Sequence, residues 1–293
     1  MQMLSTYLES FPAAVYSYAS PKTKTHLGLF WNPYLGQTRW IEPSNSYHKC
    51  EKYAFGYEKE KRKHKILRLV NEVDGSGNQI CEFEMYSLNL SRSWKVTDGF
   101  APDWCMPLIQ SSSSVKGNTY WYVQEKRPLG RGQTPPNFLV CFDFTTERFG
   151  PRLPLPFHSF FFDTVILSSV REEQLAVLYW DFRVPGPVKI WITNKVEPNA
   201  VSWNNLFLAV DTIPLSGPSF HSFYGSFFVD EETKIVVFVI KESHNYPSRN
   251  VAYIIGSKGY LKKVDLGESR NQGFGYPFVC SYVPSSVQIP NTP

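Results

Sequence analysis

The sequence has few cysteines, and they follow no recognisable pattern. Five occur in 293 residues, an odd number, and no two of them form a C-x-x-C pair. Such a set predicts neither a disulfide framework nor a zinc site, so we expect reduced thiols in a reducing compartment. The five are Cys50, Cys81, Cys105, Cys141 and Cys280.

Long hydrophobic runs and a secretory leader are also missing. No apolar stretch approaches the roughly 18 residues that a membrane-spanning helix needs. Met1–Ser10 lacks the basic region followed by an apolar core that marks a signal peptide. These features predict a cytoplasmic or nuclear protein with no membrane partner.

Charge is sparse and mixed in sign. Charged residues make up 19% of the chain, and the formal net charge is +4. The densest basic run, Lys59–Lys65, includes Glu60 and falls at an expected hairpin turn, where a solvated loop is the ordinary interpretation. A nucleic-acid surface needs a basic stripe interleaved with exposed aromatic residues, and we find none. No nucleic-acid partner is expected.

Recognisable catalytic motifs are absent as well. The six histidines have no metal-ligand spacing, and no H-E-x-x-H, glycine-rich phosphate loop or G-x-S-x-G elbow occurs. The carboxylate pairs Glu172-Glu173 and Glu231-Glu232 fall in expected tight turns, where nothing would raise a pKa. The sequence therefore predicts a protein that is not an enzyme, with no catalytic residue, no metal and no cofactor. A propeller that binds glycans or acts on them stays open as an alternative, because carboxylates distant in sequence can converge.

Aromatic residues and turn formers, in contrast, are abundant. Aromatic residues make up 16% of the chain, and 22 prolines and 18 glycines interrupt it often. No stretch keeps helical apolar spacing over three turns, so we expect an all-β fold. An aromatic residue recurs at intervals of 54, 55, 54 and 57 residues, in or just before one strand of a repeating unit. These residues are Trp40, Trp94, Phe149, Trp203 and Tyr260.

A second hairpin lies between successive aromatic positions. Its turns are expected at Glu58–Lys63, Lys116–Asn118, Arg171–Glu173 and Asp230–Glu232. Four antiparallel strands at a near-constant period are typical of a β-propeller, here kelch-like with about five to six four-stranded blades. A β-sandwich is the competing architecture, but it has no reason to keep a constant period.

The first blade is expected to be incomplete. It offers strands only at residues 13–18, 27–31 and 38–41. Residues 276–289 have the pattern of a further strand. We expect this tail to pair with the first blade and close the ring, because closure removes open strand edges.

In a propeller, alternate connections lie on the same face, and here one set is short and polar while the other is long. We call the face with the long connections the long-loop face, and the opposite one the short-turn face. Long loops on a rigid scaffold are where binding usually resides. The long connections span residues 71–79, 98–110, 125–137, 151–163, 181–187, 211–223 and 241–250.

The residue types on the long-loop face favour protein binding. Interface centres are enriched in aromatic residues, Met and Arg, although single side chains of these types can also fold a loop onto its scaffold. We expect the face as a whole to bind a protein partner. Its candidate contact residues are Trp104, Met106, Arg127, Arg131, Phe160, Phe161, Phe162, Arg183, Tyr246 and Arg249.

Several phrases of the sequence resemble the plant F-box-associated domain. Trp31–Ile41 resembles its "WNPxxxxxRWI" segment, and Tyr53–Tyr57 resembles its "ALGY" strand. Met85–Lys95 is similar to its "YDxxxxSWK" hairpin, and Val115–Trp121 to its "LKGNTYW" segment. The resemblance covers roughly residues 29–288. Further similar segments are Cys141–Gly150, Leu153–Phe157, Ile190–Trp203 and Gly225–Glu231.

The resemblance implies a substrate receptor of an SCF-type cullin–RING ubiquitin ligase. In such proteins an F-box docks on the ligase adaptor, and the associated domain captures an unknown protein target. Residues 1–26 resemble neither the "LPxDLxxEIL" helix nor the "CKxW" segment of an F-box. We therefore expect a remnant segment at 1–26 and the F-box-associated propeller at 27–293. Adaptor and cullin are partners only if an F-box is supplied elsewhere; the alternative is an orphan, decoy or decayed binding module outside any ligase.

Overall fold

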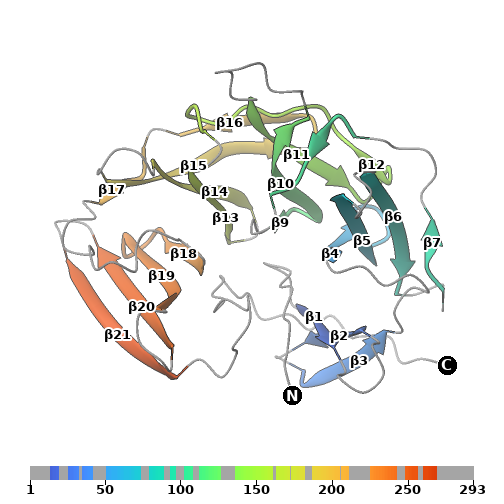
Figure 1. Cartoon of the computed structure of the whole chain (residues 1–293), viewed down its shortest axis with the longest axis horizontal. Coiled ribbons are helices and arrows are strands. Elements are labelled where there is room, and N and C mark those ends of the chain that lie inside the picture. Colours follow the sequence, from blue (N-terminus) through green and yellow to red (C-terminus); the bar gives the residue numbers. More distant parts are fainter. Residues whose placement is uncertain are drawn as a thin grey trace.

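Every regular element that the structure describes is a β-strand. In this computed structural model the strands form five sheets around a common centre (Figure 1), so the predicted all-β, propeller-like fold is confirmed. The described residues are 14–19, 26–32, 35–41, 51–73, 79–88, 93–96, 102–107, 112–126, 136–160, 163–171, 173–181, 187–204, 206–210, 225–242, 248–256 and 260–268.

The five sheets are numbered here as blades 1 to 5 in chain order. Blade 1 has three strands, β1 (Ala14–Ala19), β2 (His26–Asn32) and β3 (Gln37–Ile41). Blade 2 consists of β4 (Glu51–Glu58), β5 (Lys63–Val73), β6 (Gln79–Ser87) and β7 (Lys95–Val96). The three strands expected for the first unit are therefore confirmed, and whether the chain adds a fourth strand to it is a question that lies outside the described residues.

Blades 3 and 4 each contain five strands. In blade 3, β8 (Trp104–Cys105) and β9 (Ser112–Val115) both pair with β10 (Asn118–Glu125), followed by β11 (Asn137–Asp143) and β12 (Arg148–Phe149). Blade 4 runs β13 (Thr164–Val170), β14 (Gln174–Trp180) and β15 (Val188–Glu197), and β15 pairs with both β16 (Ala200–Trp203) and β17 (Leu208–Val210). Blade 5 is β18 (Gly225–Asp230), β19 (Ile235–Glu242), β20 (Arg249–Gly256) and β21 (Leu261–Glu268).

The repeating aromatic residue lies in the outer strand of each blade or directly before it. Trp40, Phe149 and Trp203 lie in the outer strands β3, β12 and β16. Trp94 and Tyr260 directly precede the outer strands β7 and β21. The period read from the sequence is therefore the period of the blades.

The turns of the hairpins match the residues that occupy them. Val115 pairs with Asn118, which leaves Lys116 and Gly117 as a two-residue turn with φ values of 52° and 81°. Two positive φ angles define the type I′ turn, whose twist suits adjoining strands. The four-residue turns of blades 2, 3 and 5 each end on a left-handed residue, at φ values between 52° and 56°. Those residues are Arg62, Glu147 and Lys234.

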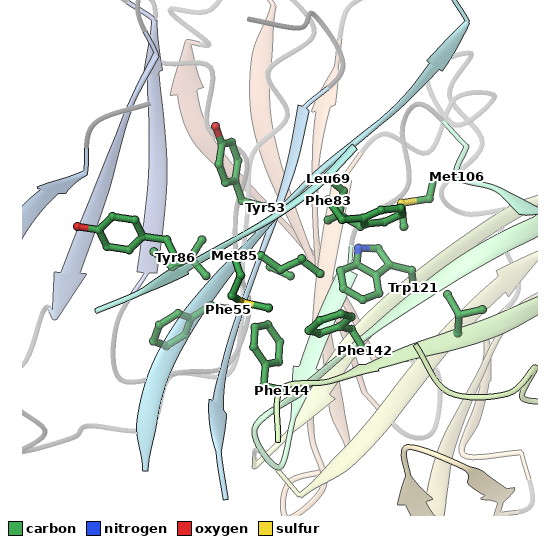
Figure 2. Packing of buried hydrophobic residues seen from close by; sticks show 14 of the residues in the cluster. Tyr53, Phe55, Leu69, Phe83, Met85, Tyr86, Met106, Trp121, Phe142 and Phe144 are labelled. Atoms are coloured by element: carbon green, nitrogen blue, oxygen red, sulfur yellow. The ribbon is translucent and has the colours of Figure 1, made fainter. Parts of the chain in front are cut away.

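The hydrophobic core lies between neighbouring blades. One cluster joins blades 2 and 3, with side chains such as Phe55, Phe83, Trp121 and Phe142 meeting in Figure 2. A second cluster joins blades 3 and 4, and a third joins blades 4 and 5. Alternate residues of each strand therefore face one neighbouring blade or the other, as the pleat of a strand requires.

Glycine permits the close approach of blades 2 and 3. A Cβ atom on Gly56 would lie 2.1 Å from the Phe144 ring and 2.5 Å from the carbonyl oxygen of Gly117. Beside it, the backbone N–H of Tyr57 donates to the Gly117 carbonyl at 3.1 Å. The glycines of the segments resembling "ALGY" and "LKGNTYW" are therefore scaffold residues, which hold two blades together.

Two expectations about the ends of the chain stay predictions. The tail at 276–289, expected to close the ring, lies outside the described residues. The boundary at residue 26 is likewise untested, although β1 falls before it and pairs along its whole length with β2. Within the part of the chain that the structure describes, no helix is long and apolar enough to cross a membrane.

Candidate protein-binding face

The described part of the long-loop face is centred on blade 3. Glu125, at the end of β10, pairs with Trp104 of β8, so the connection that contains β8 lies along the last residues of β10. The connection after β12 returns to the same region, because the backbone of Leu153 pairs with that of Leu139 on β11. Three segments distant in sequence therefore meet at one end of one blade.

Arg152 joins these three segments. Its guanidinium forms an ion pair with Asp103, and a second nitrogen lies 3.3 Å from the Glu125 carboxylate. The same group lies 4.5 Å from the centroid of the Phe138 ring, a cation–π contact. Arg152 and Asp103 are 41% and 71% exposed, so this hub presents both signs of charge to solvent.

Two lysines hold the connection at residues 102–107 by its backbone. The Lys126 ammonium donates to the carbonyl of Pro102, and Lys52 donates to that of Pro107, both at 2.7 Å. Burial lowers the pKa of Lys126, and burial raises the pKa of the thiols of Cys81 and Cys105. These thiols are therefore protonated at neutral pH, which argues against a nucleophilic role.

The connection at 151–163 is fixed to its blades in the same detailed way. One oxygen of Asp163 accepts from the backbone N–H of Phe160 at 2.7 Å and from the hydroxyl of Tyr179 at 3.1 Å. Asn137 donates to the carbonyl of Ser159 at 2.9 Å, so blade 3 also holds this segment. The described part of this connection, residues 151–160 and Asp163, is thus tied to the blades by buried or half-buried groups.

The structure places the predicted contact residues in different surroundings. Phe160 is half-buried, and Arg249 is 44% exposed with its guanidinium 2.6 Å from Asp265, so both lie at or near the surface. The structure does not bring these two together in any described contact. Six of the ten lie outside the described residues, and for them the prediction stays a prediction: Arg127, Arg131, Phe161, Phe162, Arg183 and Tyr246.

Trp104 and Met106 require a correction, because their side chains are only 3% and 9% exposed. Trp104 packs edge-on against Phe149, at 5.3 Å between ring centroids, and Met106 joins the same cluster (Figure 2). The pairing of β8 with β10 directs both side chains into the core between blades 2 and 3. They support the face from beneath instead of lining it.

Sequence reasoning missed the charged hub. Arg152, Asp103 and Glu125 come from segments up to 49 residues apart, and no spacing rule joins them. The available signal was local: Glu125 ends the strand that holds the apolar run Tyr120–Val123, and Lys126 follows it. Charges at the end of a buried strand have to find partners or solvent.

One buried charged network elsewhere could suggest catalysis, but its geometry is structural. Arg68 is 1% exposed, and it binds Glu84 at 2.6 Å and Glu51 at 2.7 Å within blade 2. Tyr53 donates to the second oxygen of Glu51 at 2.7 Å, and burial raises its pKa. The arginine and the two glutamates therefore pair with one another inside a sheet, as a structural ion-pair network does. Among the described residues, no group of three His, Cys, Asp or Glu side chains could hold a metal ion.

Comparisons with known proteins agree with the repeat and its motifs. Residues 21–289 match the family model described as "F-box associated beta propeller domain". An F-box/kelch-repeat protein of Arabidopsis thaliana is 54% identical over 273 residues, which covers 89% of this chain and 69% of that protein. An F-box protein of the same plant is 50% identical over 266 residues, covering 89% of this chain and 66% of that protein. The chain thus spans about two thirds of the length of these relatives.

Similarity to solved structures is more distant. The β-propeller domain of the trilobed protease from Pyrococcus furiosus is 15% identical, with a TM-score of 0.40, over 89% of this chain and 71% of that one. An acylaminoacyl peptidase from Pyrococcus horikoshii gives 13% identity and a TM-score of 0.43, over 89% of this chain and 39% of that one. Similarity at this level implies nothing about function.

Proposed function

Because this chain belongs to the F-box associated beta propeller domain family, we propose that it captures a protein target through its long-loop face. The observation that carries the proposal is the rigid hub at the end of blade 3. There Arg152, Lys126 and Asp163 hold the described parts of two long connections, residues 102–107 and 151–160. A surface whose loops are already held loses less entropy in ordering them on binding, which favours affinity for a protein partner.

The target would be delivered to a ubiquitin ligase of the SCF type, since the relatives are F-box proteins. Catalysis of ubiquitin transfer would then belong to other subunits, and this chain would act in the cytoplasm or nucleus. Adaptor and cullin would be partners only through an F-box supplied elsewhere. Pull-down with the ligase adaptor tests that assembly, and an absence of co-purification favours a binding module outside any ligase.

Two matched variants test the choice of face. Asp103 on the long-loop face and Glu232 on the short-turn face are both exposed acids, at 71% and 78%, and each pairs with an arginine. Asp103→Lys reverses the charge of one residue on the long-loop face without leaving a buried group unpaired. Glu232→Lys makes the same change on the short-turn face.

The readout is proximity labelling in plant cells, with and without a proteasome inhibitor. We expect Asp103→Lys to remove proteins that the unmodified chain labels and that accumulate under the inhibitor, whereas Glu232→Lys retains them. Loss of the same proteins only with Glu232→Lys would place recognition on the short-turn face and overturn the proposal. Thermal melts of both variants establish that each is folded.

A further inference from the structure

Among the described residues, the outer strand of blade 5 has one long edge with no partner strand. All eight residues of β21 are exposed or half-exposed, and among the described residues the strand pairs only with β20. Leu266 and the adjoining Tyr260 are each 53% exposed. The outer strands β7 and β12 of blades 2 and 3 have only two residues each, so they offer little edge to pair with.

The register with β20 decides which backbone groups of β21 point outward. The N–H of Gly256 donates to the carbonyl of Tyr260 at 2.9 Å, which makes this a hydrogen-bonded pair. Such pairs alternate along an antiparallel ladder. Lys262 and Val264 therefore direct their backbone groups towards β20, and the residues between them direct theirs away from the sheet. Those outward residues are Leu261, Lys263 and Asp265.

We propose that this edge pairs antiparallel with the same edge of a second copy of the chain, with Val264 on the two-fold axis. In this register Lys263 of each copy lies opposite Asp265 of the other. The backbone N–H and C=O groups of these two residues point outward and would hydrogen-bond across the interface. The neighbouring registers that keep the same hydrogen-bond parity place Lys263 opposite Lys263, or Asp265 opposite Asp265. Like charges directly opposite one another are unfavourable, so one register is selected.

The side chains next to this edge suit that pairing. Lys263 is held by Glu242 at 2.7 Å, and Asp265 is held by Arg249 at 2.6 Å. Lys263 and Asp265 are 53% and 51% exposed, so each can reach a group across the edge. Pairing would place charges in alternating order across the interface. It would also cover Leu266 with the aliphatic stem of Lys262 from the second copy.

Two features restrict the edge to specific pairing. The register of β21 shifts between its pairs with Val251 and Arg249, and Gly267 within this bulge has a φ of +96°. Bulges and lysines on an edge discourage indiscriminate strand addition. They leave Lys263–Asp265, centred on Val264, as the pairing unit. The inference is independent of the proposed target recognition.

The test measures the mass of the full chain by sedimentation over a range of concentrations. We expect a reversible monomer–dimer equilibrium. Lys263→Asp and Asp265→Lys should each raise the dissociation constant at least about tenfold, because each places like charges opposite one another. An equimolar mixture of the two variants should form a heterodimer, because every cross-strand pair is then of opposite sign.

The matched control uses a similar Lys-Val-acid pattern in blade 4, away from β21. Lys195-Val196-Glu197 lies on β15, where β16 pairs alongside it, and the two charges are 3.3 Å apart. Lys195→Asp should leave the dimer intact. If a β21 variant unfolds, Lys263→Pro replaces it, because that N–H points away from β20 and proline removes only the outward donor.

Three outcomes would overturn the proposal. The first is a chain that stays monomeric at every concentration. The bulge and the lysines would then serve only to prevent strand addition at this edge. The second is a dimer that survives both single charge reversals, and the third is a mixture of two folded variants that stays monomeric.

Discussion

Two arginines of this propeller sit at equal distances from their carboxylate partners in opposite surroundings. Arg68 lies 2.6 Å from Glu84 inside blade 2, and Arg171 lies 2.6 Å from Glu232 between the turns of blades 4 and 5. Arg68 is 1% exposed and Arg171 is 56% exposed. A buried ion cannot regain water when its partner is lost, whereas an exposed one can. Burial, more than distance, therefore decides what each pair is worth.

The largest effect is expected from breaking the buried network. Arg68→Met leaves the carboxylates of Glu51 and Glu84 without their cation, and should lower the free energy of unfolding by about 3–5 kcal/mol. Urea denaturation measures this value. The triple variant that adds Glu51→Gln and Glu84→Gln should recover much of the loss. A loss from Arg68→Met no larger than that of Arg171→Ala would contradict the comparison.

Packing between blades gives the next largest effect. Gly56→Ala pushes a methyl group against Phe144 and the backbone of Gly117, and should cost about 3 kcal/mol in the free energy of unfolding. Gly36→Ala is the control. Gly36 has a φ of +65° with nothing within 4 Å of an added Cβ, so only backbone strain of about 1 kcal/mol is expected. Equal melting temperatures for the two variants would show that the contact between blades 2 and 3 at Gly56 can accommodate a methyl group at little cost.

A pH-dependent loss of stability should come from His64. Its ring is stacked on Phe55 at 5.3 Å, and burial, assisted by the charge of Arg62, lowers its pKa from 6.5 to about 4. The unfolded chain therefore binds a proton more readily than the folded chain. Stability is complete above pH 6.5 and falls as the pH drops towards 4, by about 2 kcal/mol after allowance for partial exposure.

Urea denaturation at pH 7 and pH 4.5 measures that contribution. His64→Leu should reduce the difference between the two values, because the titrating group is gone and an apolar side chain fills its place. His158→Leu, the same substitution at an exposed position, is the matched control. If both variants behave alike, the acid sensitivity arises elsewhere in the chain.

The smallest effect is expected at the exposed end of the comparison. Arg171→Ala should cost less than about 1 kcal/mol, because the pair with Glu232 is hydrated and screened. The small loss should vanish in high salt, where screening is stronger. Measuring both arginine variants in one buffer series puts the two regions on a common scale.

The sequence predicted the scaffold well because every blade repeats the same local rules. The aromatic period placed all five outer strands, and turn residues such as Lys116-Gly117 placed the hairpins. Each of these signals depends on residues close together in the chain. The three described strands of the first blade could be predicted for the same reason, as strand patterns on either side of short turns.

The surface could not be predicted in the same way. Trp104 and Met106 looked like exposed anchors because they lie in a long connection, but the two-residue strand β8 turns them into the core. A strand of two residues is too short to show a recognisable sequence pattern. Arg152 and Asp103 meet only because two connections return to the same blade, and that convergence is a property of the fold.

The way in which Lys52 and Lys126 hold their loop has a consequence for diversification. Both bind main-chain oxygens, at Pro107 and Pro102, and a carbonyl group is the same whichever amino acid carries it. Substitutions in the stretch between those two points therefore leave the clamps intact. Members of a protein family with this scaffold can therefore differ in the sequence of the loop while the conformation of its backbone is retained.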